Sequence, residues 1–296
     1  MGDICSSFDC IVNADLSPHT KKVYLERLRF IMEERKTDLE KVLLKPTEVM
    51  EWIQQHTKTP QTQKSYISAI LAVYKHTPGL KDKYRDTYYQ WYLEFKKLHD
   101  QIDARYKQNQ PSEKQREAFV QFKDIVAKRD TLPKGSKERL LLALYTYLPP
   151  LRSDFNKVFL YQKAPKSFDH ENYMKLYDIP MLVLHEYKTS KKKDVYEKEL
   201  PPELVEEIKA SLEKGPPRDW LFVDRSKQPY VSGSFTKWAN RMLKKLFGRA
   251  LTISLIRHSY INTLDFNRLT VQEKEDIARD MAHTVGTQDK YRLIFN

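Results

Sequence analysis

A polar stretch interrupted by proline, KQNQPSEKQ (residues 107–115), divides the 296-residue chain into two parts. Polar clusters that contain proline favour a linker between folded units. Each part is long enough to bury a hydrophobic core of its own. The sequence therefore predicts two domains, residues 1–108 and residues 109–296.

The first part has the pattern of a helical domain. Ser17-Pro18 is typical of a helix start. Apolar residues then recur at helical spacing, at Val23, Tyr24, Leu28 and Ile31. Further helices are predicted over residues 47–56, 62–76 and 83–100. An aromatic stripe within the last of these, Tyr88 to Phe95, is interpreted as core and helix–helix contact rather than as a platform for stacked bases.

The second part combines helices with a little β-structure. Helices are predicted over residues 112–128, 137–147, 201–213, 232–247, 251–267 and 271–281, and around Tyr291. Two β-prone runs, MLVLHEY and VYEKEL, flank a lysine-rich turn and predict a hairpin. The expected fold class is therefore mainly α with a small β-sheet or hairpin.

Two motifs near the C-terminus carry chemistry: IRHSY (residues 256–260) and MAHTVGTQDKY (residues 281–291). The planar guanidinium of Arg257 can donate two parallel hydrogen bonds to a phosphate. Tyr291 lies eight positions after His283, and its hydroxyl can attack phosphorus and form a covalent bond to it. An arginine, a histidine and a tyrosine in this order are suited to breaking DNA by transesterification.

Two upstream segments add candidate residues. LPPLRSD places Arg152 after a helix that its prolines close, at the expected start of the next element, where free backbone N–H groups also favour an anion. Asp154 is a candidate helix cap or a carboxylate that orients an arginine. Lys188, in YKTSK, is the candidate general acid for the departing 5′ oxygen. The following lysines, residues 191–193, form a solvated turn that makes loose phosphate contacts.

In order, Arg152, Lys188, Arg257, His283 and Tyr291 resemble the catalytic domain of the tyrosine recombinases, the lambda-integrase type of site-specific recombinase. The segments SPHTKKVYLERLRFI and TQKSYISAILAVYKH resemble the helical core-binding domain of the same family. The resemblance implies a two-domain DNA clamp that cleaves and rejoins DNA through a 3′-phosphotyrosine intermediate. It also implies that the reaction needs no metal, cofactor or ATP.

The resemblance further implies partners and DNA contacts. The partner is double-stranded DNA, on which the protein assembles into a multimer, a tetramer in this family. Integrases, resolvase-like recombinases and recombinases of mobile elements or viruses all fit. The DNA-binding residues expected from the matched segments are lysines of the front domain and of the hairpin tip: Lys21, Lys22, Lys64, Lys191, Lys192 and Lys193.

One position departs from the family pattern. The family usually has a histidine three residues before the second arginine, and this chain has Ser254 there. Serine can donate a hydrogen bond to a phosphate oxygen, but it cannot accept a proton as a base near neutral pH. His283, water and the phosphate itself are the open candidates for the group that receives the tyrosine proton. His258 also matches a family histidine and is interpreted as structural.

Composition agrees with a polyanionic partner. The chain has 52 Lys and Arg residues against 40 Asp and Glu residues, a formal charge of +12 and a pI of about 9.3. Its cysteines, Cys5 and Cys10, match no zinc-ligand spacing, and a reduced intracellular location together with the DNA is expected. No apolar run approaches the roughly 20 residues that span a bilayer, so no membrane partner is expected.

Two alternatives remain open. A type IB topoisomerase uses similar residues and the same covalent chemistry but reseals the strand that it cut. The chain could also be a non-catalytic DNA-binding relative, in which Ser254 in place of the usual histidine reflects loss of the active site. The helical front domain favours a recombinase over a topoisomerase, and the retention of all five motif residues argues against decay. Because five residues follow Tyr291, exchange of the C-terminal segment between subunits is also an open question.

Overall fold

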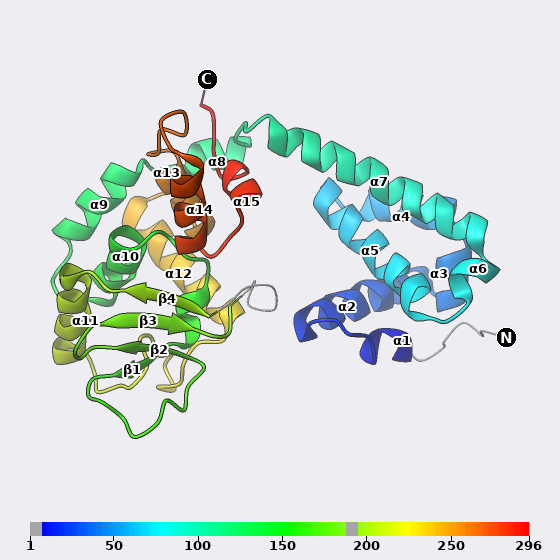
Figure 1. Ribbon diagram of the computed structural model, residues 1–296. Helices are drawn as coiled ribbons and strands as arrows, with labels where there is room; N and C mark the ends of the chain where they lie inside the picture. Colours follow the sequence, from blue (N-terminus) through cyan, green and yellow to red (C-terminus); the bar gives the residue numbers. More distant parts are fainter. Residues whose placement is uncertain (1–7, 188–194, 296) are drawn as a thin grey trace. The chain divides into compact units, whose positions relative to one another are not determined.

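The computed structural model describes residues 8–187 and 195–295 (Figure 1). The chain forms two compact units, residues 1–108 and residues 109–296. It is mostly helical and contains a four-stranded sheet, which confirms the predicted fold class. Within the described ranges, no helix is both long and apolar enough to cross a membrane.

The helices of the first unit are α1 (Asp9–Val12), α2 (Pro18–Arg35), α3 (Leu39–Leu44), α4 (Pro46–His56), α5 (Pro60–His76), α6 (Leu80–Lys83) and α7 (Arg85–Lys107). Of these, α2 to α5 each begin at a capping side chain or a proline. The hydroxyls of Ser17 and Thr59 cap α2 and α5, and each of these two helices has proline at its first position.

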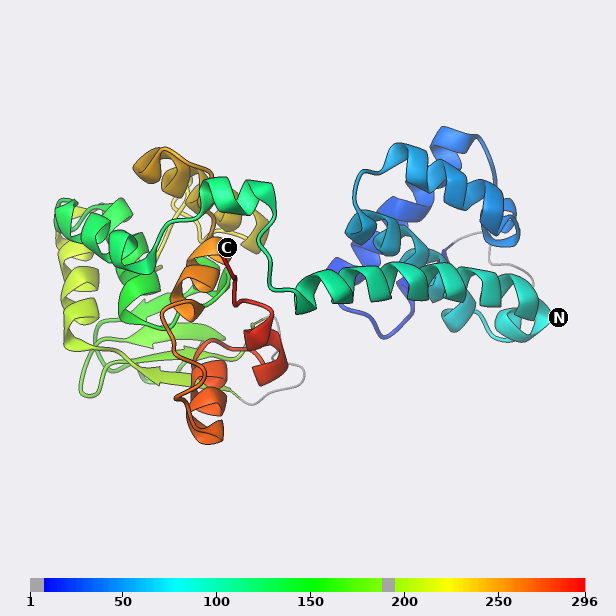
Figure 2. The same cartoon turned by 90° about the horizontal axis from the view of Figure 1, so that it is seen from above.

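The core of the first unit lies between α2, α5 and α7 (Figure 2). The Trp91 indole and the Tyr74 hydroxyl both donate to the carbonyl of Leu43, each at 2.9 Å. The aromatic stripe is core only in part, because Tyr89 and Tyr92 are 57% and 42% exposed. A helix rotates by about 100° per residue, so neighbouring aromatics cannot all face the same core.

The second unit contains α8 (Glu113–Ala118), α9 (Phe122–Thr131), α10 (Lys137–Tyr147), the 3₁₀ turn η1 (Asp154–Lys157), α11 (Pro202–Lys214), α12 (Ser232–Phe247), α13 (Ile253–Ile261), α14 (Val271–Asp280) and α15 (Val285–Asp289). The single helix expected over 112–128 is two helices, because Phe119 and Gln121 have extended backbones. The helix expected over 251–267 already ends at Ile261.

The sheet has the order β1-β2-β3-β4. Its strands are β1 (Phe159–Tyr161), β2 (Asn172–Lys175), β3 (Met181–Leu184) and β4 (Tyr196–Glu199). The predicted hairpin is confirmed, since β3 and β4 pair antiparallel from Met181↔Glu199 to Leu184↔Tyr196. Lys188 and the lysines at 191–193 lie outside the described residues.

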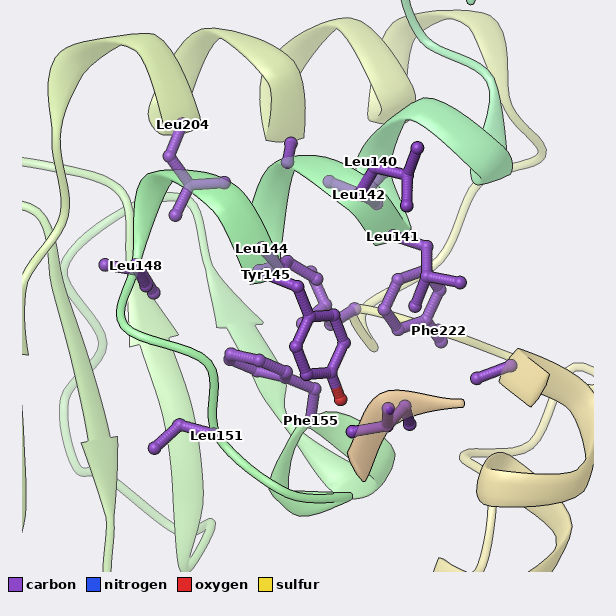
Figure 3. Close-up of a cluster of buried hydrophobic side chains, with 14 of the residues drawn as sticks. Leu140, Leu141, Leu142, Leu144, Tyr145, Leu148, Leu151, Phe155, Leu204 and Phe222 are labelled. Carbon is purple, nitrogen blue, oxygen red and sulfur yellow. The ribbon is translucent and has the colours of Figure 1, made fainter. Parts of the chain in front are cut away.

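The core of the second unit is centred on α10, which is apolar on nearly all sides (Figure 3). This helix packs against α9 and α11. Arg139 of α10 donates through Nε to both carboxylate oxygens of Glu207 of α11, at 2.8 and 2.9 Å. Glu207 is only 4% exposed, so the pair joins the two helices within the packed interior.

Candidate active site

Arg152 follows α10, which the Pro149-Pro150 pair ends. The sequence predicts that Arg152 begins a helix. In the structure it instead precedes the one-turn η1. Its backbone N–H donates to Asp154 Oδ2 at 3.0 Å, and its carbonyl accepts from the Tyr145 hydroxyl at 2.5 Å. Asp154 therefore fixes the backbone of Arg152, while the guanidinium donates to the carbonyl of Ala282 at 3.0 Å.

Arg257 lies inside α13 and is 1% exposed. Its guanidinium donates to the carbonyls of Pro150 and Met281, the latter at 3.3 Å, and to His283 Nδ1 at 2.8 Å. Burial lowers the pKa of this guanidinium, and the Tyr291 hydroxyl opposes that shift. Arginine keeps its charge even so, because its ordinary pKa lies far above neutral pH.

Two of the carbonyls that accept from the arginines, those of Met281 and Ala282, belong to a tight turn after α14. Ala282 has a positive φ of 50°, a left-handed conformation that favours glycine. The N–H groups of Ala282 and His283 bond to the carbonyls of Arg279 and Ala278, both at 2.9 Å. This is the Schellman pattern of helix termination, and it carries the chain directly into His283.

The same turn is tied to the hairpin. Lys198 of β4 forms an ion pair with Asp280, the last residue of α14, at 2.6 Å. The Tyr196 hydroxyl donates to the Asp280 carbonyl at 3.0 Å. The strand that returns from the predicted Lys188 tip, at the sheet edge near α14 (Figure 1), is thus fastened next to His283.

His283 is buried, and its hydrogen bond fixes its tautomer. An arginine can only donate, so Nδ1 must accept the 2.8 Å bond from Arg257. The neutral ring then carries its proton on Nε2. The His283 ring stacks on the Tyr291 ring with centroids 5.6 Å apart and planes 19° apart.

Tyr291 lies in a turn after α15, although the sequence pattern predicts helix there. Its ring lies against Arg257, with the guanidinium carbon 4.6 Å from the ring centroid. Burial raises the pKa of the Tyr291 hydroxyl, but the charges and hydrogen bonds of Arg257 and Arg152 outweigh this and leave the pKa below its ordinary value. The phenol is therefore held where its anion is favoured.

Two further residues of α13 bear on this site. His258 Nδ1 lies 2.6 Å from the Tyr291 carbonyl, so Nδ1 carries the proton, and burial lowers the pKa of the ring. His258 thus holds the backbone of Tyr291. Ser254 is exposed in the first turn of α13, three residues before Arg257, and hence on the same side of the helix.

The structure brings Arg152, Arg257, His283 and Tyr291 together. The lysines predicted to bind DNA in the first unit have local partners. Lys21 donates to the Val12 carbonyl at 2.7 Å, and Lys64 lies 2.9 Å from His99 Nδ1 and over the ring of Phe95. Lys22 is well exposed and forms a long 3.9 Å pair with Glu26.

A basic surface on α12 was missed by the sequence analysis. The helix has no acidic residue, and its exposed cations recur at helical spacing: Lys237, Arg241, Lys244 and Lys245. Among the residues that the structure describes, none of the four forms an ion pair. The signal was present in the sequence as positive charges that recur at helical spacing.

Comparisons with known proteins add little to this geometry. No family model matches the chain, and no curated protein matches its sequence. Among solved structures, the chain is similar to the crystal structure of XerA recombinase, with 12% identity and a TM-score of 0.42 over 97% of this chain and 92% of that one. A likeness at this level carries no information about chemistry, so the function has to be inferred from the site.

Proposed function

We propose that the protein is a site-specific DNA recombinase or integrase that cleaves and rejoins DNA through a covalent 3′-phosphotyrosine intermediate. The observation that carries the proposal is the convergence of two guanidiniums on one phenol. Arg257 lies over the ring of Tyr291, and the positive charges of Arg257 and Arg152 both lower the pKa of its hydroxyl. Such a cage can bind the non-bridging oxygens of a phosphate and neutralise charge that develops in the transition state.

The reaction that we propose exchanges one phosphate ester for another. The Tyr291 oxygen bonds to phosphorus, the bond from phosphorus to the 5′ oxygen breaks, and that oxygen takes up a proton and leaves as a hydroxyl. The phosphotyrosine keeps the energy of the broken ester. Attack by a 5′ hydroxyl reverses the step and rejoins a strand without ATP.

The hydrogen bonds of the site indicate which groups can donate a proton and which can accept one in the proposed reaction. His283 presents an N–H at Nε2, because Arg257 occupies its Nδ1 lone pair. We therefore assign His283 as a donor to the phosphate, which leaves water or the phosphate to receive the Tyr291 proton. Lys188 remains the proposed acid for the 5′ oxygen. We propose that Ser254, which is exposed in the first turn of α13, donates a hydrogen bond to a phosphate oxygen.

The proposed substrate is duplex DNA. The charge of +12 and the exposed cations of α12 support binding to a polyanion. Most of the affinity would come from phosphate contacts and would fall steeply as salt rises. Assembly of several copies on paired DNA sites belongs to the same proposal, since strand exchange needs two duplexes.

A suicide-substrate experiment tests the function. Duplexes of randomised sequence that carry a nick near the cleavage position are incubated with the protein in EDTA, and covalent adducts are recovered and sequenced. The native protein should form a 3′-linked adduct at Tyr291. Tyr291→Phe keeps the ring, so it should retain fold and DNA binding and form no adduct.

The alternatives give different results in the same assays. DNA binding without any adduct from the native protein would identify a non-catalytic relative. Efficient relaxation of a supercoiled plasmid by the monomer, without a preferred site, would identify a type IB topoisomerase. An adduct that persists in Tyr291→Phe would show that another residue is the nucleophile.

A further inference from the structure

We propose that Asn262 is a positioning residue for Tyr291, because its amide fastens the chain two residues beyond the nucleophile to the helix that carries Arg257. The effect of Asn262 on DNA cleavage rests on the proposed function. The hydrogen bonds between Asn262 and Leu293 do not depend on it. Asn262 is the C-terminal cap of α13.

The clamp consists of two hydrogen bonds between one side chain and one residue. Asn262 Nδ2 donates to the Leu293 carbonyl at 2.7 Å, and the Leu293 N–H donates to Asn262 Oδ1 at 2.9 Å. A primary amide that bonds both groups of one residue reproduces the pairing of neighbouring strands and fixes the register of the segment. The Leu293 side chain is 7% exposed and anchors the same residue by burial.

Further contacts on either side hold the segment to the same unit. His258 donates to the Tyr291 carbonyl at 2.6 Å. The Ile294 N–H donates to the Asn109 carbonyl at 2.8 Å, and the rings of Phe295 and Phe119 lie 4.4 Å apart. Every one of these partners belongs to residues 109–296, so the nucleophile is held in place by its own catalytic unit.

The clamp matters because Tyr291 lies beyond the end of α15. The ring must stay against both the Arg257 guanidinium and the His283 ring, and this requires a fixed backbone on both sides of the tyrosine. One helix, α13, therefore sets both the phosphate-binding charge, through Arg257, and the path of the nucleophile, through His258 and Asn262. Asn262 is exposed, so water competes for its bonds and the effect of losing it is moderate.

The first test uses the free protein and needs no DNA. The ionisation of Tyr291 is followed by the ultraviolet absorbance of phenolate as pH rises, as the difference between each protein and the same protein with Tyr291→Phe. Asn262→Ala should raise the pKa of Tyr291, because the ring moves away from the arginines. Asn267→Ala, an exposed asparagine beyond the same helix, is the matched control and should leave the titration unchanged.

The second test measures cleavage. On a nicked duplex that the native protein cleaves, Asn262→Ala should slow single-turnover cleavage about tenfold, with unchanged affinity for DNA and an unchanged Tm. Leu293→Pro removes the N–H of the same clamp and leaves α13 intact, so it should reproduce both effects if Asn262→Ala does not fold.

The outcomes separate the two proposals. If Asn262→Ala titrates and cleaves like the native protein, the clamp does not position Tyr291. If no variant cleaves DNA, the native protein included, the proposed function is wrong, and the titration alone decides on the clamp.

Discussion

At the scale of single residues, the chemistry of Tyr291 depends on a competition between burial and charge. Burial raises the pKa of its hydroxyl, and the two guanidiniums lower it further than burial raises it. A tyrosine whose pKa is depressed in the folded state adds stability only at high pH and loses it as the pH falls through that pKa. At neutral pH the effect therefore lies in reactivity and not in stability, and the cleavage rate should rise with pH up to the Tyr291 pKa.

Removing either arginine tests this balance. Arg152→Ala or Arg257→Ala should raise the pKa of Tyr291 and slow cleavage by on the order of 100-fold or more, as loss of a donor to a developing oxyanion does. Absorbance titration and single-turnover kinetics measure the two effects. Arg241→Ala, on the exposed face of α12, is the control and should leave the titration unaltered. If the cleavage rate is unchanged when both arginines are replaced, Arg152 and Arg257 do not stabilise the transition state.

Lys188 is tested through the leaving group. Lys188→Ala should slow cleavage of an ordinary duplex but much less so when the bridging 5′ oxygen is replaced by sulfur, since a thiolate leaves without a proton. The ratio of the two single-turnover rates is the measurement. Equal defects on both substrates would assign the acid role to another residue.

At the scale of elements, the sequence predicts most helix starts but not every end. Capping hydroxyls and prolines gave the start of α2, and two β-prone runs around a lysine-rich turn gave the β3–β4 hairpin. Strands β1 and β2, of three and four residues, were not assigned. The motif residues that converge in the site were readable from the sequence. The carbonyls of Met281 and Ala282 were not, because any residue supplies a carbonyl.

The turn after α14 permits a stability test. Ala282→Gly should stabilise the protein by up to about 1 kcal/mol, since glycine tolerates the positive φ of this position without a steric penalty. Ala278→Gly, inside α14, is the matched control and should destabilise by about 1 kcal/mol. Thermal unfolding monitored by calorimetry reports both. Equal destabilisation by the two changes would argue against the left-handed turn.

At the scale of the whole molecule, each unit has its own core, and the excess charge lies on surfaces. The four cations of α12 form an exposed basic face, whereas Arg257 is buried within α13 and Arg152 precedes η1. DNA affinity and DNA cleavage are therefore expected to depend on different residues.

Charge removal on α12 tests that separation. Lys237→Ala combined with Lys244→Ala should weaken binding to duplex DNA and reduce the slope of log K against log salt by about 2, because each lysine that neutralises a phosphate adds about one to that slope. Fluorescence anisotropy over a range of salt concentrations measures the slope. Cleavage at saturating protein should stay within about twofold of the native rate. An unchanged salt dependence would show that Lys237 and Lys244 do not contact the DNA.

The attachment of residues 293–295 to their own catalytic unit has a consequence for mixtures of defective copies. A copy with Tyr291→Phe retains its arginines but has no nucleophile, and a copy with Arg257→Ala retains the nucleophile but lacks the charge beside it. If these residues stay on their own unit when copies assemble on DNA in the proposed reaction, neither copy can lend the missing group to its neighbour, and mixing the two should restore no cleavage. In assemblies of native and defective chains, the number of strands cut should follow the number of intact chains one for one.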